Sequence, residues 1–261
     1  MLKIRLIPLL LLKDNVLVKS INFSKYQSIG NPFEEVERFN QWKVDELIYL
    51  NISTNKNISS VRPDAKGGIE SNKFQLLKNI NRRCFMPLTW GGGIKNIDDV
   101  RQALLEGADK VAINTEAFNN PDLIKKSVVN FGSQAIIISI DVKKINNEYM
   151  VFINGGKINT NCNLYDWIKE INNLEPGEIL IQSIDEDGSS LGYDLELLSI
   201  LKRKSKVPFI ACSGVGDYND FIEGCNSGAS AVAAANIWHY KDNVDYHARK
   251  ILESAGINVR K

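Results

Sequence analysis

The sequence predicts an α/β fold, a (β/α)8 TIM barrel with a pseudo-twofold half-barrel repeat, occupying residues 1–261 as one domain. Eight short apolar runs alternate with segments of helical periodicity, as expected for parallel strands joined by helical crossovers. Glycine-containing motifs recur in the same order in the two halves of the chain. The length of 261 residues suits one large barrel.

The predicted strands are apolar runs bounded by Gly, Pro or polar residues. They are Leu6–Leu12, Leu47–Ile52, Pro87–Trp90, Lys110–Asn114, Ala135–Asp141, Glu178–Ser183, Val207–Cys212 and Ala231–Ala235. The segment 1–12 has the composition of a leader peptide, but Pro8 interrupts it and no small-residue cleavage site follows. We therefore expect a buried first strand there.

Helical periodicity is clear between the strands, for example in Pro32–Phe39 and in Asn96–Leu105, which opens with a capping Asn96. The Asn-rich segment 51–57 is short enough to be a loop, and no stretch has the composition of a linker. One domain is the simplest interpretation.

Matching residues at a constant spacing in the two halves of the chain predict the half-barrel repeat. Two sets of four residues match at constant spacing, namely Gly93, Gly107, Ala108 and Val111 in the first half and Gly214, Gly228, Ala229 and Val232 in the second. Glu46-Leu47-Ile48 and Glu178-Ile179-Leu180 also place an acidic residue at the start of one strand in each half.

Composition excludes several function classes. A formal charge of +1 gives no overall field toward nucleic acid or an anionic membrane. The four cysteines form no C-x-x-C pair, which favours reduced thiols in a cytoplasmic protein over a disulfide framework or a zinc knuckle. The only histidines, His239 and His247, both follow the last strand, so we expect neither a metal site, nor a cofactor, nor a hydrolase triad.

A first candidate anion site follows the third and fourth strands. In Gly91-Gly92-Gly93 the backbone N–H groups can approach a phosphate closely, and Asn114 and Thr115 end the neighbouring strand. A tight turn and ordinary helix capping are the alternatives.

A second candidate anion site lies in the other half of the chain. Gly214 follows the seventh strand, and Ala235 and Asn236 end the eighth, where barrels commonly bind phosphate. Asp187 and Gly188 follow the sixth strand and suit hydroxyls, a metal or a phosphate. Two opposed anion sites predict a small molecule with two phosphates.

Asp141 ends the fifth strand, at the face where barrels hold their active sites, and is well placed for proton transfer. An aspartate that orients a loop or forms an ion pair is the alternative.

Four ionisable residues stand at the opposite strand ends, next to apolar runs: Arg5, Glu46, Lys110 and Glu178. Charges at such depth need partners. The two cations and two anions could form a closed ring, which would either plug the barrel or act as a gate.

Taken together these passages resemble the cyclase subunit family of imidazole glycerol phosphate synthase over essentially the whole chain. The resemblance is carried by Arg5–Pro8, Asp45–Leu47, Leu88–Ile94, Gly107–Asn114, Phe131–Gln134, Gly177–Leu180, Asp187–Gly188 and Gly192–Leu197. It implies a barrel that takes ammonia from a glutaminase docked on its N-terminal face and delivers it to a bis-phosphorylated substrate at the C-terminal face.

The family's functional positions fall on the residues already singled out. The resemblance implies Asp141 as a catalytic residue and Arg5, Glu46, Lys110 and Glu178 as an ammonia gate. It implies phosphate binding at Gly93, Asn114, Thr115, Asp187, Gly188, Gly214, Ala235 and Asn236.

The chain departs from the family at the first strand. Leu9-Leu10-Leu11-Leu12-Lys13 stands where the family has Cys-Leu-Asp-Val-Lys, so Leu11 occupies the position of the second catalytic aspartate. Losing one carboxylate of an acid–base pair removes a factor of about 10²–10⁴ in rate. Asn51, Gln182 and Asn236 also replace the usual Asp, Thr and Ser.

Three hypotheses follow. The leucine pattern resembles a divergent branch that supplies ammonia to a separate sugar amidotransferase, for acetamidino modification of surface-polysaccharide sugars; this is our first hypothesis. The second is a true cyclase of histidine biosynthesis, which a carboxylate within hydrogen-bond reach of Asp141 would favour. The third is a non-catalytic scaffold that binds a phosphorylated metabolite and regulates its partner.

Overall fold

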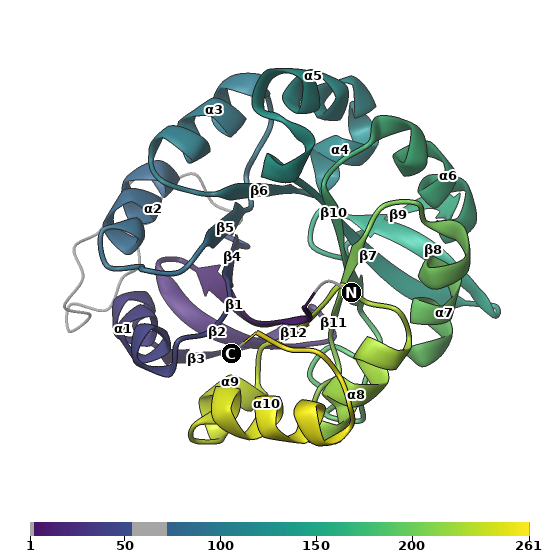
Figure 1. The fold of residues 1–261 in the computed structure, drawn as a ribbon. Coiled ribbons are helices and arrows are strands. Elements are labelled where there is room, and N and C mark those ends of the chain that lie inside the picture. Colours follow the sequence, from purple (N-terminus) through teal and green to yellow (C-terminus); the bar gives the residue numbers. More distant parts are fainter. Residues whose placement is uncertain (1–2, 54–71, 261) are drawn as a thin grey trace.

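The computed structural model describes residues 3–53 and 72–260, and its core is a closed barrel of parallel strands (Figure 1). Eight strands close the ring in the order β1 (Arg5–Lys13), β4 (Leu47–Asn51), β5 (Leu88–Gly91), β6 (Lys110–Ile113), β7 (Ile136–Ile145), β10 (Glu178–Ser183), β11 (Phe209–Cys212) and β12 (Ala231–Ala234). β12 pairs with β1 in parallel, and β7 with β10, which confirms the predicted (β/α)8 fold.

Helices surround the barrel (Figure 1). They are α1 (Pro32–Trp42), α2 (Lys73–Asn81), α3 (Ile97–Leu105), α4 (Thr115–Asn119), α5 (Pro121–Phe131), α6 (Leu164–Leu174), α7 (Leu195–Lys204), α8 (Tyr218–Asn226), α9 (Ile237–Tyr240), α10 (Val244–Ser254) and the 3-10 turn η1 (Ser133–Ala135). Asn96 caps α3 by accepting from the Asp99 N–H, as predicted. Part of the predicted 51–57 loop lies outside the described residues.

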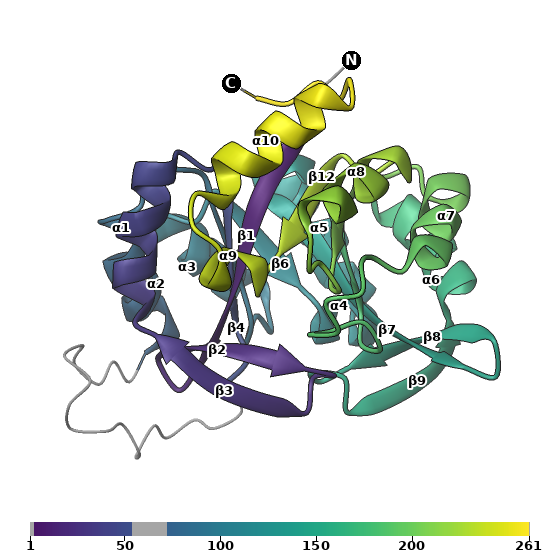
Figure 2. The ribbon, with the colours of Figure 1, turned by 90° about the horizontal axis from the view of Figure 1, so that it is seen from below.

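Two antiparallel hairpins extend the barrel at its C-terminal face. β2 (Val16–Ile21) and β3 (Lys25–Gly30) follow β1, while β8 (Glu148–Ile153) and β9 (Ile158–Asn163) follow β7. Figure 2 shows the two hairpins along the same end of the barrel. Since β1 and β7 are the first and fifth barrel strands, each half begins with a long strand and a hairpin, in keeping with the half-barrel repeat.

The interior of the barrel is packed with side chains that alternate along each strand, as in other barrels. Its buried apolar members are Ile7, Leu9, Ile48, Leu50, Ala112, Ile137, Leu180, Ile210, Cys212, Ala231 and Ala233. A second, larger apolar core lies between the strands and the helices. Polar groups are therefore confined mainly to the two ends of the barrel axis.

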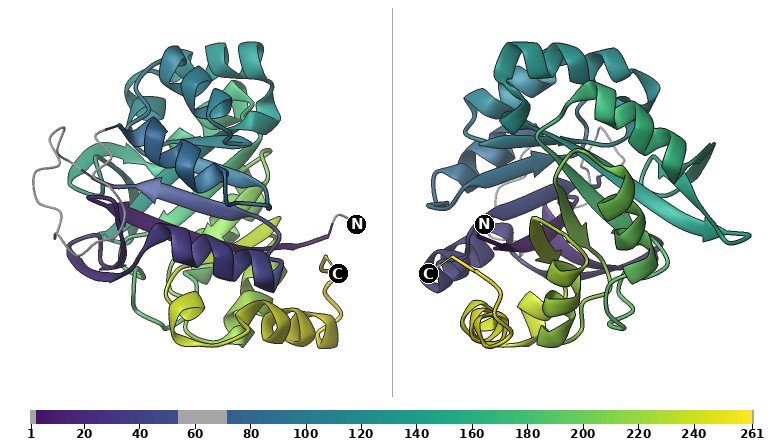
Figure 3. Two further views of the ribbon diagram at one scale, coloured as in Figure 1. Left: turned by 90° about the vertical axis from the view of Figure 1, so that its left-hand side faces the viewer. Right: turned by 45° about the vertical axis from the view of Figure 1, so that its right-hand side comes forward.

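Both ends of the chain lie at the N-terminal face of the barrel, beside α10 (Figures 2 and 3). The Ile4 N–H donates to the Asn258 carbonyl at 2.8 Å, and Ile4 forms a parallel bridge with Val259. In the described ranges, no helix has the length and apolar character needed to cross a bilayer.

Candidate functional site

A closed ring of charges lies at the N-terminal end of the barrel axis. Arg5 Nη1 contacts Glu46 Oε1 at 2.8 Å, and Arg5 Nη2 pairs with Glu178. Lys110 Nζ lies 3.0 Å from Glu46 Oε2 and 2.8 Å from Glu178 Oε2. Each cation thus touches both anions, so the structure brings together the four residues that the sequence predicted at these strand ends.

Contacts within the ring stabilise the charges of its members. Burial disfavours the charge on Arg5, but the hydrogen bonds and charges of Glu178 and Glu46 outweigh it and raise the pKa of Arg5. Burial alone would raise the pKa of Glu178, yet Arg5 and Lys110 hold that pKa below its ordinary value. Arg5 and Glu178 therefore stabilise each other's charged forms.

The axis above the ring is lined by apolar side chains. Inside the barrel, Leu9 of β1 lies beside Ile48 of β4, and Ile7 lies beside the small Ala233 of β12. Leu50, Ala112 and Ala231 belong to the same apolar group. Leu11, further along β1, packs against the same apolar group at the C-terminal end. Burying an ion in such surroundings costs far more than burying a neutral molecule.

Asp141 lies at the C-terminal end of the axis, on β7, and only 4% of its surface is exposed. Its register partner on β10 is Gln182, whose Nε2 donates to Asp141 Oδ1 at 3.1 Å and contacts Ser139 Oγ at 3.4 Å. Burial raises the pKa of Asp141 to about 7, although hydrogen bonds from Gln182 and Asn114 oppose this. A carboxyl with a pKa near neutrality can act as either an acid or a base.

Leu11 lies on the opposite side of this end of the barrel from Asp141. β1 and β7 are the first and fifth strands, so Leu11 and Asp141 reach the mouth from opposite sides. In the described part of the chain, the side-chain partners of Asp141 are the amides of Gln182 and Asn114 and not a carboxylate. These contacts do not supply the second carboxyl group that would have favoured the cyclase hypothesis.

The first candidate anion site lies where β5 and β6 end. Gly93 has a φ of +66° and its carbonyl accepts from Lys73 Nζ, which also pairs with Asp99 at 3.0 Å. Asn114 Nδ2 donates to the Ser139 carbonyl at 3.0 Å, and Thr115 Oγ1 accepts from the Asn154 N–H at 3.0 Å. The Asn114 and Thr115 side chains therefore already have protein partners. The ammonium group of Lys73 lies beside the glycine-rich turn.

The second candidate anion site lies where β10, β11 and β12 end. Asp187 Oδ2 accepts from the Phe23 N–H at 3.0 Å, so this carboxylate anchors the hairpin between β2 and β3, and burial raises its pKa. Gly188 and Gly214 both have positive φ, at +74° and +92°. A Cβ on Gly214 would come within 1.9 Å of the Gly192 carbonyl oxygen, so contact between loops requires this glycine whether or not an anion binds.

Asn236 precedes the short helix α9, and its side chain makes no cap hydrogen bond. Ala235 links it to β12. The described residues contain no group of three or more His, Cys, Asp or Glu arranged to hold a metal ion.

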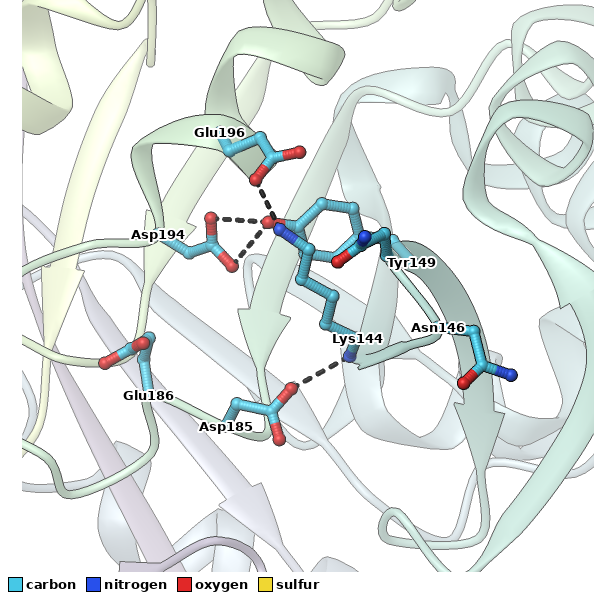
Figure 4. A pocket seen from close by; sticks show the side chains of 8 residues that line it. Lys144, Asn146, Tyr149, Asp185, Glu186, Asp194 and Glu196 are labelled. Atoms are coloured by element: carbon cyan, nitrogen blue, oxygen red, sulfur yellow. Dashed lines mark hydrogen bonds and ion pairs between the residues drawn. The ribbon is translucent and has the colours of Figure 1, made fainter.

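A polar pocket of about 630 Å³ flanks the same face, between the β7–β8 turn and the start of α7 (Figure 4). Tyr149 donates its hydroxyl to both carboxylate oxygens of Asp194, at 2.8 and 2.9 Å, and Lys144 pairs with Glu196 at 2.5 Å. Asp194 also caps α7 by accepting from the Leu197 N–H. These contacts tie the second hairpin to α7, outside the barrel axis.

Comparison with known proteins agrees with this architecture. A family model described as histidine biosynthesis protein matches residues 5–243. The chain belongs to this family.

Similar curated proteins cover the whole chain. One, from Natranaerobius thermophilus, is 38% identical over 261 residues and covers 100% of both chains. Another, from Sulfolobus acidocaldarius, is 39% identical and covers 98% of both, and one from a Thermotoga species is 36% identical over 100% of this chain and 98% of its own. All three are named imidazole glycerol phosphate synthase subunit HisF.

Some contacts of the site were not predicted from the sequence. Gln182 was noted only as a departure from the family, but it is the amide that holds Asp141. The two hairpins were missed altogether. A sequence signal lies in the two-residue turns that join each hairpin to its barrel strand, Asp14-Asn15 between β1 and β2 and Asn146-Asn147 between β7 and β8. All four residues have positive φ, as type I′ turns require.

Proposed function

We propose that the chain is the barrel subunit of a glutamine-dependent amidotransferase: it receives ammonia from a glutaminase docked on its N-terminal face and releases it at its C-terminal face. Its own cyclase chemistry is weak, and the ammonia serves a separate amidotransferase that converts the acetamido group of a surface-polysaccharide sugar into an acetamidino group.

The observation that carries the proposal is the combination of the closed ion-pair ring with Leu11. Arg5, Glu46, Lys110 and Glu178 are all retained and paired at one end of the axis, whereas the residue facing Asp141 at the other end cannot transfer a proton. A chain selected for its own acid–base reaction would keep both carboxylates.

The lining of the axis suits neutral ammonia. An ammonium ion would have to lose its hydration among apolar groups such as Ile7, Ile48 and Ile137, at a cost that neutral ammonia does not incur. The charged ring at the entrance can open by side-chain movement, since Arg5 and Lys110 are long and flexible.

A true cyclase subunit of histidine biosynthesis is the second candidate. Two observations favour it: the named relatives match over their full length, and Asp141 keeps a pKa of about 7 in a buried position. On this view Asp141 alone would act as both acid and base, with the two anion sites holding the bis-phosphorylated substrate.

Turnover of the bis-phosphorylated substrate of imidazole glycerol phosphate synthase with excess ammonium salt separates the two candidates, because external ammonia bypasses the glutaminase. We expect turnover by the wild-type chain to be about 10²–10⁴-fold below that of a relative with both aspartates. Turnover equal to that of such a relative would contradict the proposal and favour the cyclase.

Leu11→Asp is the informative variant in this assay, and Leu11→Asn, which has nearly the same size and polarity but cannot transfer a proton, is its control. Recovery of turnover in Leu11→Asp alone would show that the phosphate sites are competent and that only the carboxylate is missing. Glutamine hydrolysis by a co-expressed glutaminase, measured with and without this chain, tests the docking half of the proposal. No binding and no stimulation would refute it.

A further inference from the structure

We propose that Arg249 is a positioning residue for the ion-pair ring: it fixes Asp45, and through Asp45 it positions Arg5, the first residue of β1, and Glu46, which immediately precedes β4. The inference rests on the proposed function of the ring as the entrance for ammonia, and it adds to the ring a residue from the last helix of the chain.

The contacts form a continuous chain from α10 to the ring. Arg249 Nη2 lies 3.1 Å from Asp45 Oδ1, and Asp45 Oδ2 accepts from the Leu6 N–H at 2.8 Å. Leu6 and Asp45 are the immediate chain neighbours of Arg5 and Glu46, whose side chains pair at 2.8 Å. The hydrogen bond between Leu6 and Asp45 therefore fixes the distance between the two backbone segments from which the Arg5 and Glu46 side chains extend.

Charge balance makes Arg249 essential to this arrangement. Its Nε and Nη2 also bind Asp245, at 2.9–3.0 Å, so one guanidinium holds two carboxylates that are each less than one-tenth exposed. Burial raises the pKa of Asp245, while Arg249 opposes that shift. Without the guanidinium, Asp45 and Asp245 would repel each other, and the contact of Asp45 with the Leu6 N–H would be disturbed.

The same guanidinium reaches the end of the chain. Arg249 Nη1 donates to the Arg260 carbonyl, and the neighbouring Asn258 carbonyl accepts from the Ile4 N–H, just before Arg5. The segment 258–260 is therefore linked to the ring by two indirect routes, one through Ile4 and one through Arg249 and Asp45. A protein that docks on the N-terminal face and moves this segment would move one side of the ring with it.

Lys110 reports on the ring in the isolated protein. Its ammonium is held by two carboxylates and its side chain is 18% exposed, so it should react slowly with a small amine-acylating reagent. Lys73, which pairs with Asp99 and is 26% exposed, is the internal reference, since it lies beside Gly93 at the other end of the barrel. The two acylation rates are measured by mass spectrometry after digestion.

In Arg249→Met we expect Lys110 to be acylated roughly tenfold faster than in the wild-type chain, because the ring opens locally, while Lys73 keeps its rate. Asp245→Asn is the matched control: it removes one contact of Arg249 on α10 but leaves the pair with Asp45, so Lys110 should keep the wild-type rate. If Arg249→Met does not fold, the double variant Arg249→Met/Asp245→Asn, which leaves one buried carboxylate instead of two, should show the same acceleration.

An unchanged Lys110 rate in the folded Arg249 variants overturns the proposal. So does an equal acceleration at Lys73, or the same acceleration in Asp245→Asn, because either would indicate a general loosening of the barrel or of α10. The experiment contains neither glutaminase nor acceptor, so its failure is distinct from failure of the ammonia proposal.

Discussion

Replacing Asp141 by asparagine should stabilise the fold, by an amount that depends on pH. Burial raises the pKa of Asp141 from 3.8 to about 7. Between these two pH values the folded chain holds a proton that the unfolded chain has lost, so wild-type stability falls as the pH rises. Below about pH 4 both states are protonated and there is no loss; above about pH 7 the loss is complete.

The loss amounts to about 4 kcal/mol, at about 1.4 kcal/mol for each pH unit between 3.8 and 7. Asparagine has the same shape, stays neutral, and its oxygen can still accept from Gln182 Nε2. Asp141→Asn should therefore unfold at nearly the same temperature as the wild-type chain at pH 4. At pH 8 it should unfold at a temperature on the order of 10 °C higher.

Thermal unfolding of both proteins between pH 4 and 8, followed by circular dichroism, is the assay. Asp98→Asn, on the exposed surface of α3, is the control and should change the unfolding free energy by less than about 0.5 kcal/mol. A difference between Asp141→Asn and wild type that does not grow with pH would refute the reasoning, as would a less stable variant at pH 8.

Three further substitutions test separate parts of the structure, each by urea or thermal unfolding. Arg5→Met leaves two buried carboxylates with one lysine and should cost about 3–5 kcal/mol; a loss below 1 kcal/mol would mean that the ring is not buried as described. Gly92→Ala should cost more than about 2 kcal/mol, since φ is +100° and the new Cβ would lie 1.9 Å from the Asn51 carbonyl oxygen; a neutral result would contradict that backbone geometry. Tyr149→Phe should cost about 1.5–3 kcal/mol by removing the donor to Asp194, and a stable Tyr149→Phe would show that water replaces the hydroxyl.

The barrel strands could be predicted because each is a buried apolar run between breakers. Glu178–Ser183 has the predicted limits, and β1 differs from the prediction by one residue at each end. The outer strands of the hairpins, β3 and β9, could not be predicted because they are largely polar and poorly buried, so neither an apolar run nor a strict alternation marks them. The inner strands β2 and β8 are more apolar and were overlooked.

The ring could be predicted because a charge next to a buried strand must be paired, and the repeat placed Glu46 and Glu178 at equivalent positions. Two other features depend on register and docking, which sequence periodicity does not determine. Gln182 meets Asp141 only because β10 pairs with β7 in one register. Arg249 meets Asp45 only because α10 packs at the N-terminal face.

The meeting of the two chain ends bears on how the barrel folds. Ile4 and Val259 lie side by side, and pairing β1 with β12 closes the longest loop between neighbouring strands of the barrel. A circular permutant that joined these ends and opened the chain at Gly132, before β7, would make that pairing local and the β6–β7 pairing distant. The native barrel would be the same, but the entropy of loop closure would be redistributed, so folding would be expected to start from a different pair of strands.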